Sequence, residues 1–497
     1  MLLTLPACGK KTDEANRAAG ITPPNALALV SVNLSPSIEQ KANLLTIARL
    51  FPGARDKVKG EFDSARDDLL GQVLKDSGLD FKADVQPWLG KEAAVAVLPP
   101  GDADSPLFVA MVQTNDKAKA TAAIAKAAKA GTFKGAYGLV DDFVIISDQP
   151  NKADNQAAID LITAQAKKTD GGLAKSASFT NVVDQLHGDR LVLGWVDVKA
   201  SIGVADNLAA LGPASAFVKS FSKDAGTIAF DLHAESKAVV FQGVATTTGT
   251  VEGSTATLTR SLPATALAAL TLFDLGKSVT KGLTAISGVA GSDVTSQFEQ
   301  ATGLSLQDDI LSWMHGEAVV VAGAVPTGQP YPNFALVVEP TDKAKAAAAV
   351  TKIKDKLAGI GFNLEERKIG ETTAYVVPQP FLPGIQPAMA LFPDRFVLAN
   401  SPAFLGDLAK SATPGLGDSA AYKAVLGSDD KGTTSQFVVL IDPIREAIEK
   451  AVYSSDPSGK AAYEKDVKPN LEPLSAFGFK SLRDGAFNRI EVRLTFD

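Results

Sequence analysis

The sequence predicts an α+β protein made of two homologous domains, each a largely antiparallel sheet with helices packed on it. Three observations predict this class. Residues 78–95 and 303–320 share one motif, which indicates an internal duplication. Within each copy, short apolar segments are joined by tight turns, which favour antiparallel strand pairing. Alanine-rich segments without Pro or Gly separate these strands and are typical of helices that cover one face of a sheet.

The duplication is clearest around a tryptophan. The two segments read GLDFKADVQPWLGKEAAV and GLSLQDDILSWMHGEAVV, and the run DKAKA occurs at residues 116–120 and again at 342–346. Further matched pairs follow in the same order along the chain, so chance is a poor explanation. The residues that mark the core of each copy are Trp88 and Glu92 in the first, and Trp313 and Glu317 in the second.

These matches divide the chain into four parts. Residues 1–22 are predicted to be a truncated lipoprotein signal and a tether, and 23–249 the first repeat. Residues 250–262 are predicted to be a linker rich in Thr, Gly and Ser, and 263–497 the second repeat. The length of 497 residues agrees with this division, because domains usually contain about 100–200 residues.

The elements of the first repeat follow from apolar runs and from the turn residues between them. Pro52-Gly53 breaks a long helical stretch, Pro99-Pro100-Gly101 separates two strands, and Asn115 is the predicted N-cap of an alanine-rich helix. In chain order we predict a strand at 26–33, a helical stretch at 37–74, strands at 93–98 and 107–113, a helix at 116–130, a strand at 143–147, a helix at 154–166, a strand at 190–198, a helix from 199, and a hairpin of 227–233 and 238–245. The second repeat is predicted to keep this order and to end in a strand that reaches Phe496.

The same features resemble a known family. The second repeat begins Pro263-Ala-Thr-Ala-Leu-Ala, and in the first repeat Gly-Leu precedes Trp-Leu-Gly-Lys-Glu at the start of a strand pair. A Lys/Ala helix then follows an Asp-Lys pair. Over nearly all of the chain after Pro23, as two copies, this pattern is similar to the bacterial family called domain of unknown function 3352. The resemblance implies an exported or membrane-tethered protein with no assigned activity.

The N-terminus resembles the lipobox of bacterial lipoproteins. A short apolar run ends in the small residue Ala7, directly before Cys8, the one cysteine of the chain. In lipoproteins the signal peptidase cuts before this cysteine, which then carries the lipid, so the resemblance assigns Cys8 as the lipidation site. The alternative is a lone thiol on a frayed terminus. The predicted location is therefore the cell envelope, with the protein exported and lipid-anchored to a bacterial membrane.

Composition argues against several other classes. The net charge of −7 provides no basic field for nucleic acid phosphates. One cysteine excludes an internal disulfide framework and multi-cysteine zinc or iron–sulfur sites, and three histidines leave little room for a His-based metal site. We therefore expect no nucleic acid partner, no metal and no other cofactor.

Motifs for catalysis are weak. Ser-x-x-Lys occurs without the partner motifs of serine-acylating enzymes. Gly276-Lys277-Ser278 follows bulky residues, whereas a phosphate-binding loop needs a glycine-rich backbone. Asp197 and Asp442 end strands and precede helices, so both are predicted to be N-caps. No residue is therefore predicted to be catalytic.

The tryptophan–glutamate pairs have two interpretations. In the functional one, Trp88 with Glu92 and Trp313 with Glu317 line ligand clefts. In the structural one, each Trp fills the core and each Glu pairs with its own turn. The structural interpretation is favoured, because large aromatic side chains are more often part of a core than a ligand platform.

The second repeat has two loops that the first lacks, at residues 326–332 and 378–387. The latter carries Phe381, Leu382 and Ile385 between prolines. A Pro-stiffened loop has little ordering entropy left to lose on docking, so these three residues form a candidate interaction loop. An equally weighted alternative is that their side chains fold back over the sheet.

The sequence thus predicts a non-enzymatic envelope protein with a binding or scaffolding role, whose partner is a protein or an apolar ligand. One alternative is a carrier of a lipid or other apolar ligand, which requires a large apolar cavity. Another is a hydrolase with dispersed catalytic residues, which requires clustered carboxylates or Ser–His–Asp geometry in a concave pocket.

Overall fold

The computed structural model shows an α+β protein, as the sequence predicts. It describes residues 16–497 except 56–61, 76, 101–104, 205–224, 248–252, 281–282, 284–293, 330, 360, 428–430 and 456. Cys8 therefore lies outside the described residues. The chain divides into two compact units, the first of residues 1–249 with 486–489 and the second of residues 250–485 with 490–497.

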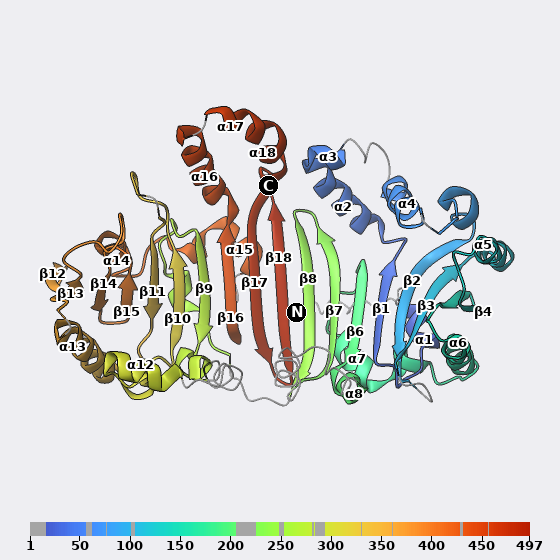
Figure 1. Ribbon diagram of the computed structural model, residues 1–497, viewed down its shortest axis with the longest axis horizontal. Helices are drawn as coiled ribbons and strands as arrows, with labels where there is room; N and C mark the ends of the chain where they lie inside the picture. The colour runs from blue at the N-terminus through green and yellow to red at the C-terminus, as the bar shows by residue number, and fades with distance from the viewer. Residues whose placement is uncertain are drawn as a thin grey trace, which may run out of the picture. The chain divides into compact units, whose positions relative to one another are not determined.

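An antiparallel sheet forms the centre of the first unit (Figure 1). Its strands are β1 (Ala28–Asn33), β2 (Leu89–Leu98), β3 (Leu107–Thr114), β4 (Ala136–Val140), β5 (Phe143–Ser147), β6 (Val192–Asp197), β7 (Ala225–Glu235) and β8 (Ala238–Thr247). Across the sheet their order is β4–β5–β3–β2–β1–β6–β7–β8. The first strand of the unit is thus its central strand.

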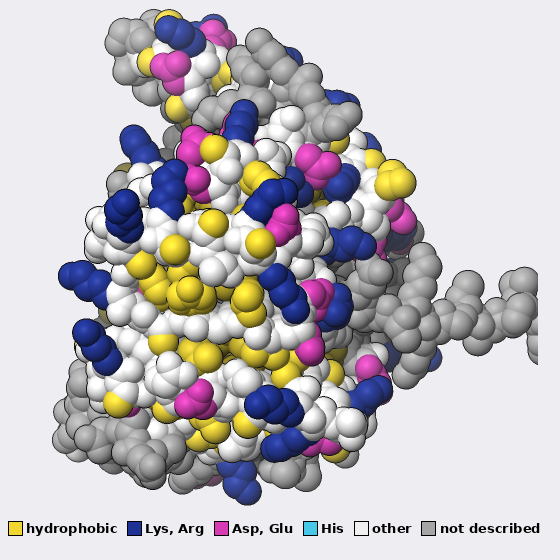
Figure 2. Space-filling model, turned by 90° about the vertical axis from the view of Figure 1, so that its right-hand side faces the viewer, with side chains coloured by type: hydrophobic (Ala, Val, Ile, Leu, Met, Phe, Trp, Pro, Cys, Tyr) yellow, Lys and Arg dark blue, Asp and Glu magenta, His cyan; other side chains and the backbone are white. Residues whose placement is uncertain are grey.

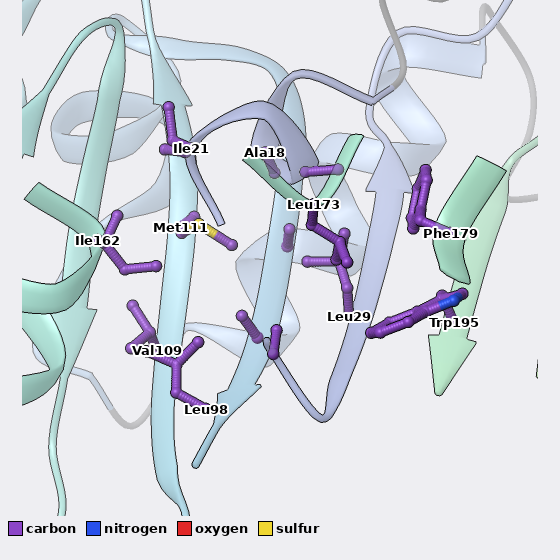
Figure 3. Packing of buried hydrophobic residues seen from close by; sticks show 14 of the residues in the cluster. Ala18, Ile21, Leu29, Leu98, Val109, Met111, Ile162, Leu173, Phe179 and Trp195 are labelled. Carbon is purple, nitrogen blue, oxygen red and sulfur yellow. The ribbon is translucent and has the colours of Figure 1, made fainter. Parts of the chain in front are cut away.

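Helices pack on both faces of this sheet, so the expectation that they cover one face is wrong. They are α1 (Arg17–Ile21), α2 (Ile38–Leu50), α3 (Pro52–Arg55), α4 (Phe62–Val73), η2 (Phe81–Val85), α5 (Lys117–Lys129), α6 (Lys152–Ala166), η3 (Gly172–Lys175), α7 (Ala177–Val183) and α8 (Val198–Val204). We call the face that carries Leu29 and Met111 the inner face. It packs on α1, α6 and α7, and Trp195 lies at one side of this cluster beside Phe179 of α7 (Figure 3). The opposite, outer face packs on α5 and η2 at its β3–β5 end, through Trp88 and Val144.

The sheet of the second unit repeats this topology. Its strands are β9 (Ala268–Phe273), β10 (Glu317–Ala322), β11 (Phe334–Val338), β12 (Glu365–Ile369), β13 (Thr372–Val376), β14 (Ala388–Leu391), β15 (Phe396–Ala399), β16 (Thr433–Leu440), β17 (Leu474–Asp484) and β18 (Phe487–Phe496), except that residues 487–489 of β18 belong to the first unit. Their pairing gives the order β12–β13–β14–β15–β11–β10–β9–β16–β17. Beginning at β14, this order matches that of β4 to β7 in the first unit, strand for strand. The hairpin β12–β13 is an addition beyond β14.

The helices of the second unit also cover both faces of its sheet. They are α10 (Thr257–Arg260), α12 (Val294–Thr302), η5 (Leu306–Ile310), η6 (Leu311–Trp313), α13 (Lys343–Gly359), α14 (Pro402–Asp407), η7 (Leu416–Asp418), α15 (Ala420–Leu426), α16 (Ile441–Ser455), α17 (Pro457–Ala462), η8 (Tyr463–Val467) and α18 (Lys468–Leu471). The inner face packs on α10, α14 and α15, and the outer face packs on α13 around Trp313.

Two short helices were not predicted. Residues 17–22 were expected to belong to the tether and residues 257–262 to the linker, yet they contain α1 and α10. Ala18, Ile21 and Leu262 are buried in the cores of the two units. The hydrophobic core of each unit therefore begins upstream of the proline at which the predicted repeat starts, Pro23 in the first unit and Pro263 in the second.

The predicted N-cap of α5 was wrong by one residue. Asp116 caps the helix, because its Oδ1 accepts a hydrogen bond from the backbone N–H of Lys119 at 3.1 Å. The Asn115 side chain instead donates to the carbonyl oxygen of Leu89. Asp197 does cap α8 through the N–H of Ala200, whereas Asp442 lies within the first turn of α16 and pairs with Arg445.

Among the described residues, none of the helices combines the length and the apolar character that crossing a bilayer requires.

Candidate functional site

The two repeat-marking tryptophans occupy equivalent core positions. The indole Nε1–H of Trp88 donates to the carbonyl oxygen of Asp84 at 2.6 Å, and that of Trp313 donates to the carbonyl oxygen of Asp309 at 3.1 Å. Both rings are buried in the cluster on the outer face of their sheet. This satisfied, desolvated environment is that of a core residue.

Each of these aspartates also forms an ion pair with a lysine of the helix that packs on the same face of the sheet. Asp84 Oδ2 lies 2.5 Å from Lys126 Nζ on α5, and Asp309 Oδ2 lies 2.5 Å from Lys352 Nζ on α13. The hydrogen bond from the lysine is the main cause that holds the pKa of each carboxyl below its ordinary value. We call these two contacts the Asp–Lys pairs.

The repeat-marking glutamates hold the short helices in place. Glu92 Oε2 accepts the backbone N–H groups of Arg17 and Ala18 at 3.1 and 3.2 Å. Glu317 Oε2 and Oε1 accept those of Leu258 and Thr259 at 2.6 and 2.8 Å. Carboxylates are favourable at such positions, because the first N–H groups of a helix have no partner inside it.

The prediction that each glutamate pairs with its own turn is therefore wrong. Strand alternation places Glu92 on the same face as Ala94 and Leu98, which is where α1 lies, so its carboxylate reaches an upstream segment. In the second unit, burial raises the pKa of Glu317 despite three hydrogen bonds to its carboxylate from Leu258 and Thr259.

The candidate interaction loop presents two apolar side chains to solvent. Phe381 and Leu382 are 57% and 50% exposed, and the loop is closed by backbone hydrogen bonds between Ile385 and each of them. The ring of Phe381 meets the edge of Phe362 with 5.9 Å between centroids. Gly384, with φ of 83°, packs against Gln329 of the other added loop, so the two loops lie side by side.

The outer face of the first unit is apolar well beyond the part that α5 covers. One row of cross-strand neighbours runs through seven strands without a polar side chain. Its members, from β5 to β8, are Ile146, Ala110, Val95, Val30, Gly194, Phe230 and Gly243. Val95 is 47% exposed and its neighbour Phe108 is 52% exposed. The ring of Phe230 lies over Gly194 and 5.5 Å from the ring of Phe241.

The second unit has the same kind of face. Its row, from β15 to β17, consists of Leu398, Leu336, Val320, Leu270, Phe437 and Phe479. Val320, Phe334 and Leu398 are each more than two-fifths exposed. We call these two surfaces the outer apolar faces. Sequence alternation alone did not reveal them, because these strands are apolar at both inward and outward positions.

Two histidines that the sequence left unassigned meet in the first unit. The imidazoles of His187 and His233 stack with 4.3 Å between centroids. Asp231 is fully buried, and its Oδ1 lies 2.7 Å from His233 Nδ1 while its Oδ2 accepts the backbone N–H of His187. His187 and His233 border a cavity of about 300 Å³ that Glu39 and Ser236 also line.

This cluster contains part of the geometry that a hydrolase requires. Asp231 orients His233, but within the described chain no hydroxyl group is hydrogen-bonded to either imidazole ring. The ring nitrogen of His187 is engaged by the carbonyl oxygen of Asp189 instead. Nor do three His, Cys, Asp or Glu side chains of the described residues form a group suited to a metal ion. The cluster therefore lacks the activated nucleophile of a Ser–His–Asp triad.

A family model described as "Protein of unknown function (DUF3352)" matches residues 5–494 of the chain. No curated protein and no solved structure matches it.

Proposed function

We propose, for a chain that belongs to the DUF3352 family of proteins of unknown function, a non-enzymatic binding or scaffolding role in the bacterial cell envelope. In this proposal Cys8 carries the lipid that anchors the protein to a membrane, and the outer apolar faces bind the partner. The lipobox-like run before Cys8 supports the anchor.

The outer apolar faces are the observation that carries the binding role. Soluble monomers rarely expose contiguous apolar patches of more than a few hundred Å². Here, strands in the middle of each sheet present half-exposed Val, Leu and Phe side chains, including Val95, Phe108, Val320 and Phe334. Covering such a surface gains roughly 25 cal/mol for each Å² of apolar area removed from water. A complex in which the partner covers this surface with apolar side chains would be stabilised by that free energy.

We also propose that the two units arose by duplication. Three kinds of structural agreement support this: the strand order, the Asp–Lys pairs beside Trp88 and Trp313, and the glutamates that receive the first N–H groups of α1 and α10. A binding protein with two similar faces can contact its partner twice, which raises the overall affinity through effective concentration.

A carrier of a lipid or other apolar ligand is the second candidate. It is favoured by a cavity of about 440 Å³ in the second unit, between α13 and the β13–β14 strands. Val350, Tyr375, Leu391 and Phe392 line this cavity, together with the polar side chains of Lys343, Thr351, Thr372 and Thr373. Its size is within the range of small-molecule sites, about 300–1,000 Å³.

Photo-crosslinking from the outer apolar faces tests these proposals. A benzophenone amino acid replaces Phe108 or Phe334 in the full-length protein expressed in a bacterium, and Leu69, an exposed residue of α4, serves as the control position. A discrete protein adduct from both face positions but not from Leu69 supports a binding or scaffolding role, whereas lipid adducts support the carrier. The same adduct pattern at all three positions, or none at the face positions, would overturn both.

A further inference from the structure

The edge strand of the first unit, β4, leaves one side open to pairing with another strand. β4 pairs with β5 and, in the part of the chain that the structure describes, with no other strand. The two strands are joined by the two-residue turn Asp141-Asp142, so the flanking pair Val140 and Phe143 is hydrogen-bonded. Because such pairs alternate along an antiparallel ladder, Tyr137 and Leu139 direct their backbone N–H and C=O groups away from β5.

Nothing in the sequence of β4 blocks pairing with another strand. Residues Ala136–Val140 read AYGLV, with no charge and no proline, and Tyr137 and Leu139 are each 40% exposed. Edge strands are usually protected by charges, proline or bulges. The edge strand of the second unit follows that rule, because β12 reads EERKI and its four charged residues are exposed.

The second unit also shows that this position can accept a strand. By strand order and register, Met389 of β14 corresponds to Tyr137 of β4, and Met389 pairs with Tyr375 of β13. The hairpin β12–β13 thus covers in the second unit the edge that is open in the first. An antiparallel strand with apolar side chains is compatible with this edge of the sheet.

The face around β4 combines apolar side chains with charges of both signs. Figure 2, which looks onto this end of the first unit, shows hydrophobic side chains in a band across the middle of the face, with Lys and Arg around it. Lys134 precedes β4 and is exposed, and Asp141 and Asp142 follow it. Because Arg17 pairs with Asp142, the exposed charges that flank the strand are Lys134 at its start and Asp141 at its end.

This arrangement is complementary to itself. If two β4 strands pair antiparallel about a twofold axis at Gly138, Tyr137 of one copy stands opposite Leu139 of the other, and the outward backbone groups of both residues meet. The same register brings Lys134 of one copy next to the exposed Asp141 of the other, whereas Asp142 is already held by Arg17 and Gln113 of its own chain. Cross-strand apolar and opposite-charge pairs both stabilise a sheet. An isologous contact of this kind closes as a dimer.

We propose that β4 is a self-association site, through which two copies of this chain join their first-unit sheets edge to edge. The contact uses an edge strand rather than the outer apolar faces, so it is independent of the proposed function. It leaves both of those faces free to bind a partner. It also removes the exposed edge that would otherwise invite uncontrolled strand addition.

Cysteine crosslinking tests the register. In a Cys8→Ala background, which has no other cysteine, Tyr137→Cys and Leu139→Cys are made as separate variants of the full chain. A hydrogen-bonded antiparallel pair has about 5.5 Å between Cα atoms, which a disulfide can span. Mild oxidation should give a covalent dimer when the two variants are mixed and little when either is oxidised alone. Equal crosslinking in every sample, or none in the mixture, would contradict the proposed register.

Sedimentation velocity tests the association itself. The Cys8→Ala protein should sediment as a dimer, and Leu139→Lys should weaken self-association by at least about tenfold, because it places a charge at the paired edge. Leu69→Lys, the same substitution at an exposed position of α4, should leave the dimer intact. A monomeric Cys8→Ala protein, or a Leu139→Lys variant that still dimerises with unchanged affinity, would refute the proposal. Circular dichroism of each variant shows whether the fold is retained.

Discussion

At the scale of single residues, the Asp–Lys pairs show how a partly exposed ion pair can stabilise the folded protein. The lysines of both pairs are about half exposed, whereas the carboxylates of Asp84 and Asp309 are largely shielded. Exposed pairs contribute little by Coulomb attraction alone. Here each carboxylate also accepts a backbone N–H, from Asp80 in the first unit and Ser305 in the second. Its ionised form is therefore stabilised by two partners.

These aspartates should make the protein sensitive to acid. Their pKa values are lowered in the folded state, so the stability they contribute is present above the ordinary carboxyl pKa and is lost as the pH falls through the lowered values. In urea unfolding at a series of pH values, the double variant Asp84→Asn, Asp309→Asn should be less stable than the wild type at pH 7. Its stability should also decline less steeply below about pH 4.

The control for this prediction is Asp355→Asn, which changes an exposed aspartate of α13 that has no ion pair with another described residue. Glu317 acts with the opposite sign, because its pKa is raised and its contribution improves as the pH falls. Glu317 is present in the wild type and in every variant, so its contribution to the pH dependence cancels when their stabilities are compared. A double variant with the wild-type slope would contradict the role assigned to the Asp–Lys pairs.

At the scale of elements, the docking of α1 depends on a close backbone approach at η3. Gly172 has φ of 55°, and a Cβ there would lie 2.5 Å from the carbonyl oxygen of Thr22 and 2.6 Å from that of Gly20. The next residue, Leu173, donates its N–H to the carbonyl oxygen of Thr22 at 2.8 Å. A side chain at position 172 would therefore separate α1 from the rest of the core.

Gly172→Ala should destabilise the protein more than Gly131→Ala. Both glycines have positive φ, which costs an L-residue about 1 kcal/mol, but a Cβ at Gly131 meets nothing within 4 Å. The clash at Gly172 should add about 2 kcal/mol or more to the loss in free energy of unfolding. Urea denaturation of the two variants measures the difference. Equal losses would mean that η3 does not support α1.

The same elements show what the sequence could and could not predict. The strand at 143–147 is found with the predicted bounds, because its apolar residues lie between clear turn signals. β4 was not predicted, because it is short and contains Gly138, which weakens a strand pattern. α1 and α10 were missed because each is about one turn long and depends on a hydrogen bond to a distant glutamate. The pairing of His187 with His233 is likewise a product of the tertiary fold.

At the scale of the whole molecule, the proposed anchor determines where the protein acts. Replacing Cys8 with alanine removes the thiol that the lipid would occupy. The wild type should sediment with membranes and incorporate labelled palmitate, because two or three acyl chains hold a protein firmly. The Cys8→Ala variant should do neither and should be found in the soluble fraction.

The Asp84→Asn, Asp309→Asn variant is a suitable control for the anchoring experiment, because it changes the folded units and keeps Cys8. It should fractionate like the wild type. Membrane association of Cys8→Ala at the wild-type level would contradict lipid anchoring through this residue.

The buried glutamates have a practical consequence for anyone who cuts the chain into fragments. A recombinant first unit that started at Pro23, where the repeated sequence begins, would lack the two amide donors that Glu92 uses. Its buried carboxylate would then lose two of its hydrogen-bond donors, which raises the free-energy cost of keeping it charged in the protein interior. A second unit started at Pro263 would leave Glu317 in the same position. Autonomous versions of either half must therefore begin upstream, at Asn16 and Ala256 or earlier.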